Sequence, residues 1–388
     1  MKNIIKLTFA AFALLTISTA CSEGYIDDIT SVPQSEDKVA PVVQISNPAS
    51  GTVNIPFTDT MADYTFGFKV SDDIEIKTIS ISLDGNILNT YNTFLDYRNY
   101  AGTYLYKNLG LGNHTFKVDA VDLSGKTTTK TFAFNVTNVY QPIYEGENFF
   151  VPFDYPSSDP LKVVSDLLQN TPATSNPLSL TSGVSGNGIQ GANLKYISYA
   201  KPNEWIKNAE SFTVSFWFKL NGQTKNNNGG NGPEHIFSIP TTTDHWSGGQ
   251  GMLLMETNAT GTQIKFPIVD KTKADKWFNW EGADAIPGIA DNKWRHCALV
   301  YDAVTSKMTL YIDGVANAKQ VAWDNHGSIN MDATTATEFR LGAGPKQVNN
   351  DTADDWLRST WKGGLDQFRL FSKALSASDI KNIYDSKL

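Results

Sequence analysis

The strongest constraint on the fold is an alternation of apolar and polar side chains that recurs along most of the chain. Residues 211–219, SFTVSFWFK, place apolar residues at every second position: Phe212, Val214, Phe216 and Phe218. Successive side chains of an extended strand point to opposite faces, so a period of two predicts strands with one buried face. The chain is therefore expected to be all-β.

The stretch KWRHCALVYDAVTSKMTLYIDGVANA, residues 293–318, shows the same pattern twice. A polar, turn-like segment at 302–307 separates two alternating runs, and Asp313-Gly314 is a common hairpin turn. We predict an antiparallel meander here. Only the end of the chain is helical in pattern, because Ser376 and Asp379 form a capping-box-like start before Ile380 and Ile383.

Length and charge limit the domain organisation and the class of partner. A chain of 388 residues is too long for one small core and suggests about two domains. Its net charge of −8 and its lack of a basic cluster argue against nucleic-acid binding.

The first 20 residues predict a secretory signal peptide. Two lysines flank the start of an apolar run at residues 7–17, and three small residues follow it. The next residue is Cys21, and the arrangement resembles the bacterial lipoprotein signal, in which that cysteine receives the lipid. The resemblance implies lipidation of Cys21 and attachment to the outer membrane, with exposure at the cell surface. Polar, acidic residues 21–40 are then a tether.

The second cysteine, Cys297, is expected to be chemically inert. It lies in the middle of an alternating run, on the apolar face. A free cysteine in that position behaves as a small hydrophobe. Two cysteines are also too few for a disulfide framework in an exported protein.

Residues 41–138 predict a first β-sandwich of about 100 residues. Short alternating runs separated by turns are typical of immunoglobulin-like (Ig-like) sandwiches. The segment LGLGNHTFKVDAVDLSGKTTTKTFAFNV resembles bacterial Ig-like modules through Gly112, His114, Val118, Ala120, Asp122 and Gly125. We expect a spacer domain in which His114 is structural. A linker is predicted at residues 139–150.

Residues 151–388 resemble a larger module, the LamG-like jelly roll of the concanavalin A-like lectin/glucanase superfamily. One strand motif matches at Phe212, Thr213, Ser215, Trp217 and Lys219. A second motif matches at Trp294, His296, Ala298, Tyr301 and Asp302, and a third at Leu310, Tyr311, Asp313 and Gly314. The closing motif matches at Gly363, Asp366, Arg369, Ala374, Leu375, Ser376, Ile380 and Tyr384. The resemblance implies that Trp294 and His296 are packed framework residues.

Candidate ligand-binding residues are tryptophans that lie outside the most regular strands. All nine tryptophans follow residue 200, and several have polar neighbours that could bind sugar hydroxyls. A flat ring beside such groups suits a sugar, which has apolar C–H faces and polar edges. The candidates are Trp246 with Asp244 and His245, Trp277 and Trp280, and Trp323 with Asp324 and Asn325. The alternative is that these rings fix long loops onto the sandwich.

Asp366 is a candidate metal ligand. In LDQFRL it shares parity with Phe368 and Leu370, and a carboxylate on an apolar face is costly unless it is paired or coordinated. Calcium prefers oxygen ligands, and relatives of this fold often carry it, so calcium is a candidate cofactor. A hydrogen-bonded carboxylate or an ion pair with Arg369 is the alternative.

These observations favour a monomeric surface lipoprotein that binds an extracellular polysaccharide or glycan without turning it over. The first alternative is a glycoside hydrolase or lyase of the same superfamily. Retaining hydrolases of that superfamily carry closely spaced acids on one strand, and no such run occurs here. The second alternative is an adhesion or structural module that binds protein through an apolar patch.

Overall fold

The computed structural model describes residues 33–387, apart from residues 34, 58, 155–160, 162, 164–177, 202, 204, 206–209, 222–230, 244, 347 and 349–355. The chain divides into two compact units: the first consists of the residues up to Ile55 and Asp59–Thr137, and the second consists of Pro56–Thr58 and the residues from Asn138 onward. The predicted signal peptide, Cys21 and most of the predicted tether lie outside the described residues.

Two sheets form the first unit. Its strands are β1 (Val42–Asn47), β2 (Thr52–Asn54), β3 (Met61–Ser71), β4 (Ile76–Leu83), β5 (Asn86–Tyr91), β6 (Asn99–Gly110), β7 (Gly112–Asp122) and β8 (Thr127–Thr137). One sheet has the order β1-β3-β6, and the other has the order β2-β8-β7-β4-β5.

The core of the first unit comes from the alternating residues of these strands. The buried side chains include Phe66, Phe68 and Val70 of β3, Ile79, Ile81 and Leu83 of β4, and Phe116, Val118 and Ala120 of β7. The alternation predicted for these strands is therefore confirmed. The ring of His114 has structural contacts, since its Nδ1 lies 2.8 Å from Asp84 Oδ2, its Nε2 lies 2.9 Å from the Gly110 carbonyl oxygen, and it packs against Phe134. The Ig-like assignment stays a prediction.

The second unit is also built of strands. They are β9 (Glu147–Val151), β10 (Ser179–Ser182), β11 (Asn187–Gln190), β12 (Ile197–Tyr199), β13 (Phe212–Lys219), β14 (Asn231–Pro240), β15 (Gly249–Asn258), β16 (Gly261–Val269), β17 (Asp275–Trp280), β18 (Trp294–Asp302), β19 (Lys307–Ile312), β20 (Val315–Ala322), β21 (Phe339–Leu341) and β22 (Gly364–Phe371). Two 3-10 turns, η1 (Gly282–Asp284) and η2 (Trp356–Arg358), and the helix α3 (Ala377–Ser386) complete it.

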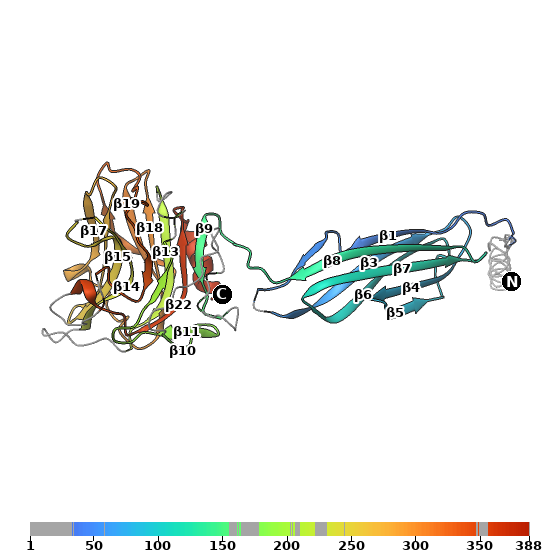
Figure 1. Ribbon diagram of the computed structural model, residues 1–388, viewed down its shortest axis with the longest axis horizontal. Coiled ribbons are helices and arrows are strands. Elements are labelled where there is room, and N and C mark those ends of the chain that lie inside the picture. The colour runs from blue at the N-terminus through green and yellow to red at the C-terminus, as the bar shows by residue number, and fades with distance from the viewer. Residues whose placement is uncertain are drawn as a thin grey trace, which may run out of the picture. The chain divides into compact units, whose positions relative to one another are not determined.

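These strands make two facing sheets, which Figure 1 shows as two layers of the second unit. One sheet has the order β10-β11-β22-β13-β18-β19-β20, with β9 also paired to β22, and the other has the order β12-β21-β14-β15-β16-β17. A single core lies between them and contains the predicted Phe212, Val214, Phe216 and Phe218, all fully buried. The predicted all-β fold, with a jelly roll in the C-terminal part, is confirmed.

Strand β9 corrects the predicted linker at residues 139–150. It begins at Glu147, inside that segment, and its residues are buried. Phe149 and Val151 pair with Leu370 and Phe368 of β22, which extends the sheet by one strand beside β22. The sequence pattern missed this strand because both of its faces are covered, so it lacks the polar alternation of a half-exposed strand.

The meander predicted at residues 293–318 is confirmed as β18, β19 and β20. Asp313 and Gly314 have positive φ angles, 51° and 77°, as a tight hairpin turn requires. His296 and Cys297 of β18 are fully buried on opposite faces of their strand. Burial raises the pKa of the Cys297 thiol, which keeps it protonated and unreactive.

Helix α3 begins as the sequence predicts. Asp379 N donates 3.1 Å to Ser376 Oγ, and Ser376 N donates 3.1 Å to the Asp379 carboxylate, which completes a capping box. Ile380 and Ile383 are buried against Ala298, Val300 and Tyr311 on the outer face of the larger sheet. Tyr384 of this helix stacks on Trp217 at 5.4 Å between ring centroids, which explains how Trp217 is buried on the face opposite the core.

Candidate functional site

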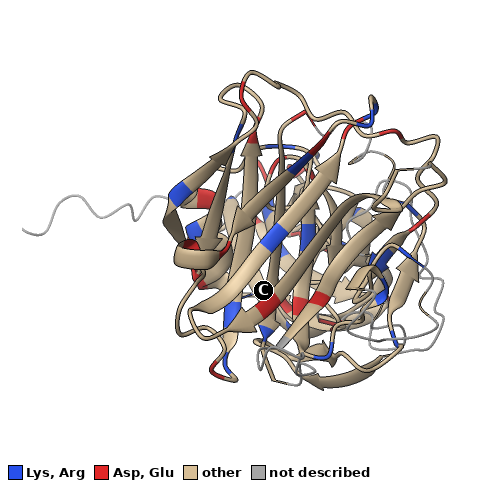
Figure 2. Ribbon diagram, turned by 90° about the vertical axis from the view of Figure 1, so that its left-hand side faces the viewer, with Lys and Arg blue, Asp and Glu red and all other residues tan. Residues whose placement is uncertain are grey.

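The candidate site lies on the outer face of the six-stranded sheet, the face turned away from the core. Because side chains alternate along β15, Leu253 and Met255 point into the core. Met252 and Leu254 point to the outer face, where they form a small cluster with Leu357 of η2. Figure 2 views the second unit from the side on which β14, β15 and β17 lie in Figure 1, and acidic and basic residues are interspersed there. This face is therefore apolar near η2 and of mixed charge elsewhere.

The two tryptophans of β17, Trp277 and Trp280, lie on opposite faces of the sheet. Phe278 and Trp280 are fully buried in the core, so Trp277, one position from Phe278, projects from the outer face. Trp277 is half-buried and pairs across the sheet with Pro267 of β16. The residue is therefore partly exposed on the outer face of the sheet.

Three tryptophans from separate segments meet on this face, and we call them the tryptophan cluster: Trp246, Trp277 and Trp356. Trp246, in the loop between β14 and β15, stacks on Trp277 with 5.7 Å between centroids and an interplanar angle of 6°. Trp356 of η2 is tilted by about 50° against both rings, at 6.3 and 5.8 Å. Trp246 is 45% exposed, so the cluster presents an aromatic surface to solvent.

A polar network lies beside the tryptophan cluster. Lys265 Nζ lies 2.6 Å from Glu256 Oε1 and 3.2 Å from Glu281 Oε2, and Asn279 Nδ2 donates 3.0 Å to Glu281 Oε1. Lys265 and Asn279 are cross-strand partners, in the register that also pairs Pro267 with Trp277. The network therefore offers charged and amide groups within the same sheet face as Trp277.

These contacts fix the charge states of the network. Burial alone would lower the pKa of Lys265, but hydrogen bonds and the charges of Glu256 and Glu281 outweigh it and raise that pKa. Burial alone would raise the pKa of Glu281, but Asn279 and Lys265 outweigh it and lower that pKa. Lys265 therefore stays cationic and Glu281 anionic at neutral pH.

The loop that carries Trp246 is a tight turn. His245 Nδ1 lies 2.8 Å from Ser247 Oγ, and Gly248 N donates 3.0 Å to the His245 carbonyl oxygen. The His245 ring packs against Trp246 at 5.3 Å between centroids. Asp244, the third candidate of this loop, lies outside the described residues. His245 thus belongs to the same constellation as Trp246.

Trp280 was predicted as a sugar ligand, and the structure places it in the core instead. Its ring is fully buried, and its Nε1 donates 3.1 Å to the Lys319 carbonyl oxygen. The reason is parity, because Trp280 follows Phe278 at a spacing of two and so points to the core face. It cannot stack on a ligand without unfolding of β17.

The group formed by Trp323, Asp324 and Asn325 lies apart from the tryptophan cluster. Trp323 packs partly against the core and contacts Phe278, a core-facing residue, at 6.5 Å between centroids. Its ring stacks on His326 at 3.5 Å, whereas Asp324 and Asn325 are exposed. These residues therefore fix a loop at the sandwich edge and do not extend the outer-face site.

Sequence reasoning missed two residues of the site, Trp356 and His235. His235 is fully buried, its Nδ1 lies 2.9 Å from Ser359 Oγ, and its ring is parallel to that of Trp356 at 5.8 Å. Trp356 comes from a segment 79 positions after Trp277, so no local pattern could connect them. Its only signal was a tryptophan in irregular, polar sequence.

Asp366 is fully buried, but on the face opposite the one predicted. Gln367 has a positive φ of 46° and lies at a bulge in the pairing with β13, where one extra residue interrupts the alternation. Leu365, Phe368 and Leu370 therefore reach the core, and Asp366 does not share their face. The prediction that Asp366 shares a face with Phe368 and Leu370 is wrong for this reason.

A second carboxylate accompanies Asp366. Asp366 Oδ2 accepts a hydrogen bond of 2.8 Å from Val184 N, whereas its Oδ1 is buried without a hydrogen bond among the described residues. Asp154 accepts from Asn187 N in the same turn between β10 and β11. Burial, with the nearby Asp154 carboxylate, raises the pKa of Asp366 to about 8. The buried Asp366, which has one orphaned oxygen, and the half-buried Asp154 offer only oxygen donors, the type of ligand that calcium prefers.

Residues 194–381 match the sequence model of the family described as the concanavalin A-like lectin/glucanases superfamily, so the second unit contains a domain of that superfamily. No curated protein sequence matches the chain. Within the described residues, no helix is long and apolar enough to cross a membrane.

Solved structures with a similar chain path include toxin binding domains. The binding domain of Paraclostridial Mosquitocidal Protein 1 is 15% identical, with a TM-score of 0.43, and the match covers 62% of this chain and 52% of that chain. The Botulinum neurotoxin serotype G binding domain is 15% identical, with a TM-score of 0.44, over 62% of this chain and 50% of that chain. The chain thus spans about half the length of these structures.

Proposed function

We propose that the chain is a lipid-anchored surface protein whose second unit binds an extracellular polysaccharide or glycan at the tryptophan cluster. The observation that carries this proposal is the meeting of Trp246, Trp277 and Trp356 on one sheet face beside the Lys265 network. Aromatic rings accept the C–H faces of sugars, and the adjacent charged and amide groups can bind the hydroxyls. Cys21 would carry the lipid, and residues 21–40 would act as the tether.

Calcium is part of the proposal as a structural ion near Asp366. Asp366 and Asp154 would hold it, because the buried Oδ1 of Asp366 has no hydrogen bond and the half-buried Asp154 carboxylate lies near the same β10–β11 turn. When bound, calcium would supply a positive charge that allows both carboxylates to stay ionised in a buried place. Its role would be to fix the turn against β22, away from the tryptophan cluster.

The first alternative function is a glycoside hydrolase, and the contacts of Lys265 argue against it. Glycoside hydrolysis needs one protonated and one ionised carboxyl group at the scissile bond. Glu256 and Glu281 share a sheet face, but both contact the Lys265 ammonium, and the pKa of Glu281 is lowered. This arrangement opposes a general-acid role for Glu281.

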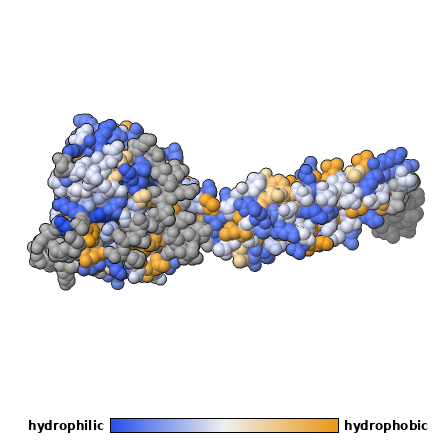
Figure 3. Space-filling view, viewed as in Figure 1, coloured by the Kyte–Doolittle hydropathy of each residue, from blue (hydrophilic) through white to orange (hydrophobic). Residues whose placement is uncertain are grey.

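An adhesion module that binds protein is the other alternative. Such a module would expose a contiguous apolar patch. On the face drawn in Figure 3, hydrophobic residues are scattered among hydrophilic ones. The tryptophan cluster, with the Lys265 network beside it, favours glycan binding over this alternative.

The test is a retention screen in gels that contain diverse polysaccharides, using the soluble chain from residue 22, with an assay for new reducing ends. We expect retention by at least one polysaccharide and no new reducing ends. New reducing ends would replace the proposal with the hydrolase. Absence of both retention and turnover would contradict glycan binding and favour a protein ligand.

A further inference from the structure

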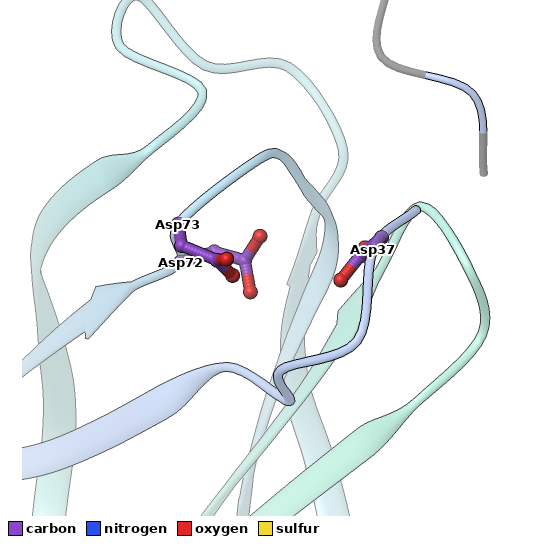
Figure 4. Close-up of side chains that lie close together, drawn as sticks. All are labelled: Asp37, Asp72 and Asp73. Atoms are coloured by element: carbon purple, nitrogen blue, oxygen red, sulfur yellow. The ribbon is translucent and has the colours of Figure 1, made fainter. Parts of the chain in front are cut away.

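Three aspartates gather at one end of the first unit, far in sequence from the site described above. Asp37 precedes β1, and Asp72 and Asp73 directly follow β3. One carboxylate oxygen of each lies within 4.8 Å of those of the other two. Figure 4 shows Asp72 and Asp73 on one segment and Asp37 facing them from another.

Two of these carboxylates are buried with oxygens that have no hydrogen bond. Asp37 is 3% exposed, and neither of its carboxylate oxygens has a hydrogen-bond partner among the described residues. Asp72 Oδ2 accepts from Ile74 N at 3.0 Å and Glu75 N at 2.7 Å, but its buried Oδ1 accepts from no described group. Burying an ionised carboxylate without partners is costly, so these oxygens need a compensating positive charge.

A fourth carboxylate lies next to the group and shares this need. Asp122, at the end of β7, is fully buried, and its Oδ1 accepts from Ser124 Oγ and Lys126 N. Its Oδ2 has no hydrogen bond and lies 3.8 Å from Lys126 Nζ, which also lies 3.6 Å from Asp37 Oδ1. Lys126 therefore connects Asp122 to the three clustered aspartates.

One lysine cannot balance this much negative charge. Four carboxylates and one ammonium leave a formal charge of −3 (−4 + 1 = −3) when all are ionised. Within the described part of the chain, Lys126 is the only cation that forms an ion pair with any of them.

We propose that Asp37, Asp72 and Asp73 bind one calcium ion, with Asp122 beside it. The donors are all oxygens, and calcium takes six to eight oxygen ligands at about 2.3–2.6 Å. Oxygens on opposite sides of such an ion are about 5 Å apart, so separations of no more than 4.8 Å are compatible with one shared ion. Magnesium demands stricter octahedral geometry and shorter distances, which ligands from two separate segments satisfy less readily.

The ion would join two parts of the chain that are otherwise held apart by charge. It would fix the segment before β1, which contains Asp37, to the loop after β3. Calcium would thereby order the chain just as it enters the first unit. This site is independent of the glycan proposal and of the calcium proposed near Asp366, because it lies wholly within the first unit.

The test exploits the distribution of tryptophan, since all nine tryptophans belong to the second unit. Calorimetry of the soluble chain from residue 22 would report the unfolding of both units, and tryptophan fluorescence would report only the second. We expect 1 mM calcium to raise the melting temperature of the first unit above its value in the presence of a chelator. This is the calorimetric transition that tryptophan fluorescence does not report. Magnesium at the same concentration should shift this transition much less.

Two variants locate the effect, and a third is the matched control. Asp73→Asn removes an exposed ligand without disturbing buried packing, and Asp37→Asn removes a buried one. Asp63→Asn changes an exposed aspartate of β3 in the same unit that pairs with Lys107 instead. Calcium affinity, measured by titration calorimetry, should fall at least tenfold at this site in the first two variants and stay unchanged in Asp63→Asn.

Three outcomes would overturn the proposal. The first is a wild-type chain whose first-unit transition does not respond to calcium. The second is an equal calcium response in Asp73→Asn, Asp37→Asn and wild type. The third is an equal response to magnesium, which would exclude a calcium-selective site. If Asp37→Asn fails to fold, the comparison between Asp73→Asn and Asp63→Asn still tests whether calcium binds at these aspartates.

Discussion

Trp277 and Trp280 lie three positions apart on β17, and they have opposite roles. Trp277 projects from the outer face into the tryptophan cluster, whereas Trp280 is fully buried in the core. The sequence contained this distinction, because KWFNW places Trp280 in phase with Phe278 and Trp277 out of phase with both. A ring in polar sequence is therefore a ligand candidate only when its parity differs from that of the core residues.

Truncation of Trp280 should destabilise the second unit far more than truncation of Trp246. We expect Trp280→Ala to cost roughly 3–5 kcal/mol of unfolding free energy, because it leaves a large cavity in the core. Trp246→Ala removes a ring that is 45% exposed and lies outside the core, and should cost about 1 kcal/mol or less. Urea unfolding followed by the fluorescence of the remaining tryptophans measures both. Similar losses in the two variants would contradict the placement of Trp280.

His296 should make the second unit sensitive to mild acid. Burial, with the nearby Arg369 charge, lowers the pKa of His296 to about 3, below the value of about 6.5 in an unfolded chain. Below pH 6.5 the unfolded chain binds a proton that the folded chain does not, so stability is full above pH 6.5 and falls as the pH drops toward 3. The expected loss is about 1.4 kcal/mol per pH unit, or about 2 kcal/mol between pH 6.5 and 5.

The contribution of His296 is measured as a difference between two pH profiles. His296→Gln keeps a group that can hydrogen-bond Ser215 Oγ, which lies 2.9 Å from His296 Nε2, but it cannot be protonated in this range. Its unfolding free energy, measured by urea and tryptophan fluorescence, should fall less steeply between pH 6.5 and 5 than that of wild type. His114→Gln, in the first unit, should keep the wild-type slope. Parallel profiles for wild type and His296→Gln would refute the prediction.

At the scale of elements, the sequence predicted what depends on local periodicity and missed what depends on irregular backbone. The strands of 293–318 and the capped start of α3 follow from alternation and from a side-chain cap, both of which are local. The face occupied by Asp366 does not follow, because the bulge at Gln367 shifts the alternation by one residue. Strand β9 was missed because Phe149 and Phe150 are both buried.

The turn between β10 and β11 is where we expect calcium to bind in the second unit. Calcium should raise the tryptophan-monitored melting temperature of wild type, because the ion would neutralise the buried Asp366 carboxylate together with the half-buried Asp154 carboxylate. Asp366→Asn should abolish this shift, and Asp291→Asn, which changes an aspartate of the same unit that pairs with Arg295 instead, should leave it unchanged. Melting curves with calcium and with a chelator measure it. A calcium shift that persists in Asp366→Asn would exclude this site.

At the scale of the whole molecule, the predicted all-β class and C-terminal jelly roll are confirmed. They could be predicted because the apolar alternation that marks a strand is visible in a short stretch of sequence. The sheet order could not be predicted, since β22 pairs with β9, β11 and β13, which lie far from it in sequence. The candidate site has the same limit, because Trp246, Trp277 and Trp356 come from three distant segments. Long-range pairing brings them together, and local pattern does not encode it.

The most direct test of the central proposal is a comparison of glycan affinity among single tryptophan variants. The polysaccharide that retains wild type in the gel screen would be titrated calorimetrically into wild type, Trp277→Ala and Trp323→Ala. Trp277→Ala should weaken binding about tenfold or more, since loss of about 1.4 kcal/mol of stacking corresponds to that factor. Trp323→Ala, outside the tryptophan cluster, should stay within about twofold of wild type. Unchanged affinity in a folded Trp277→Ala variant would contradict the assignment of the site.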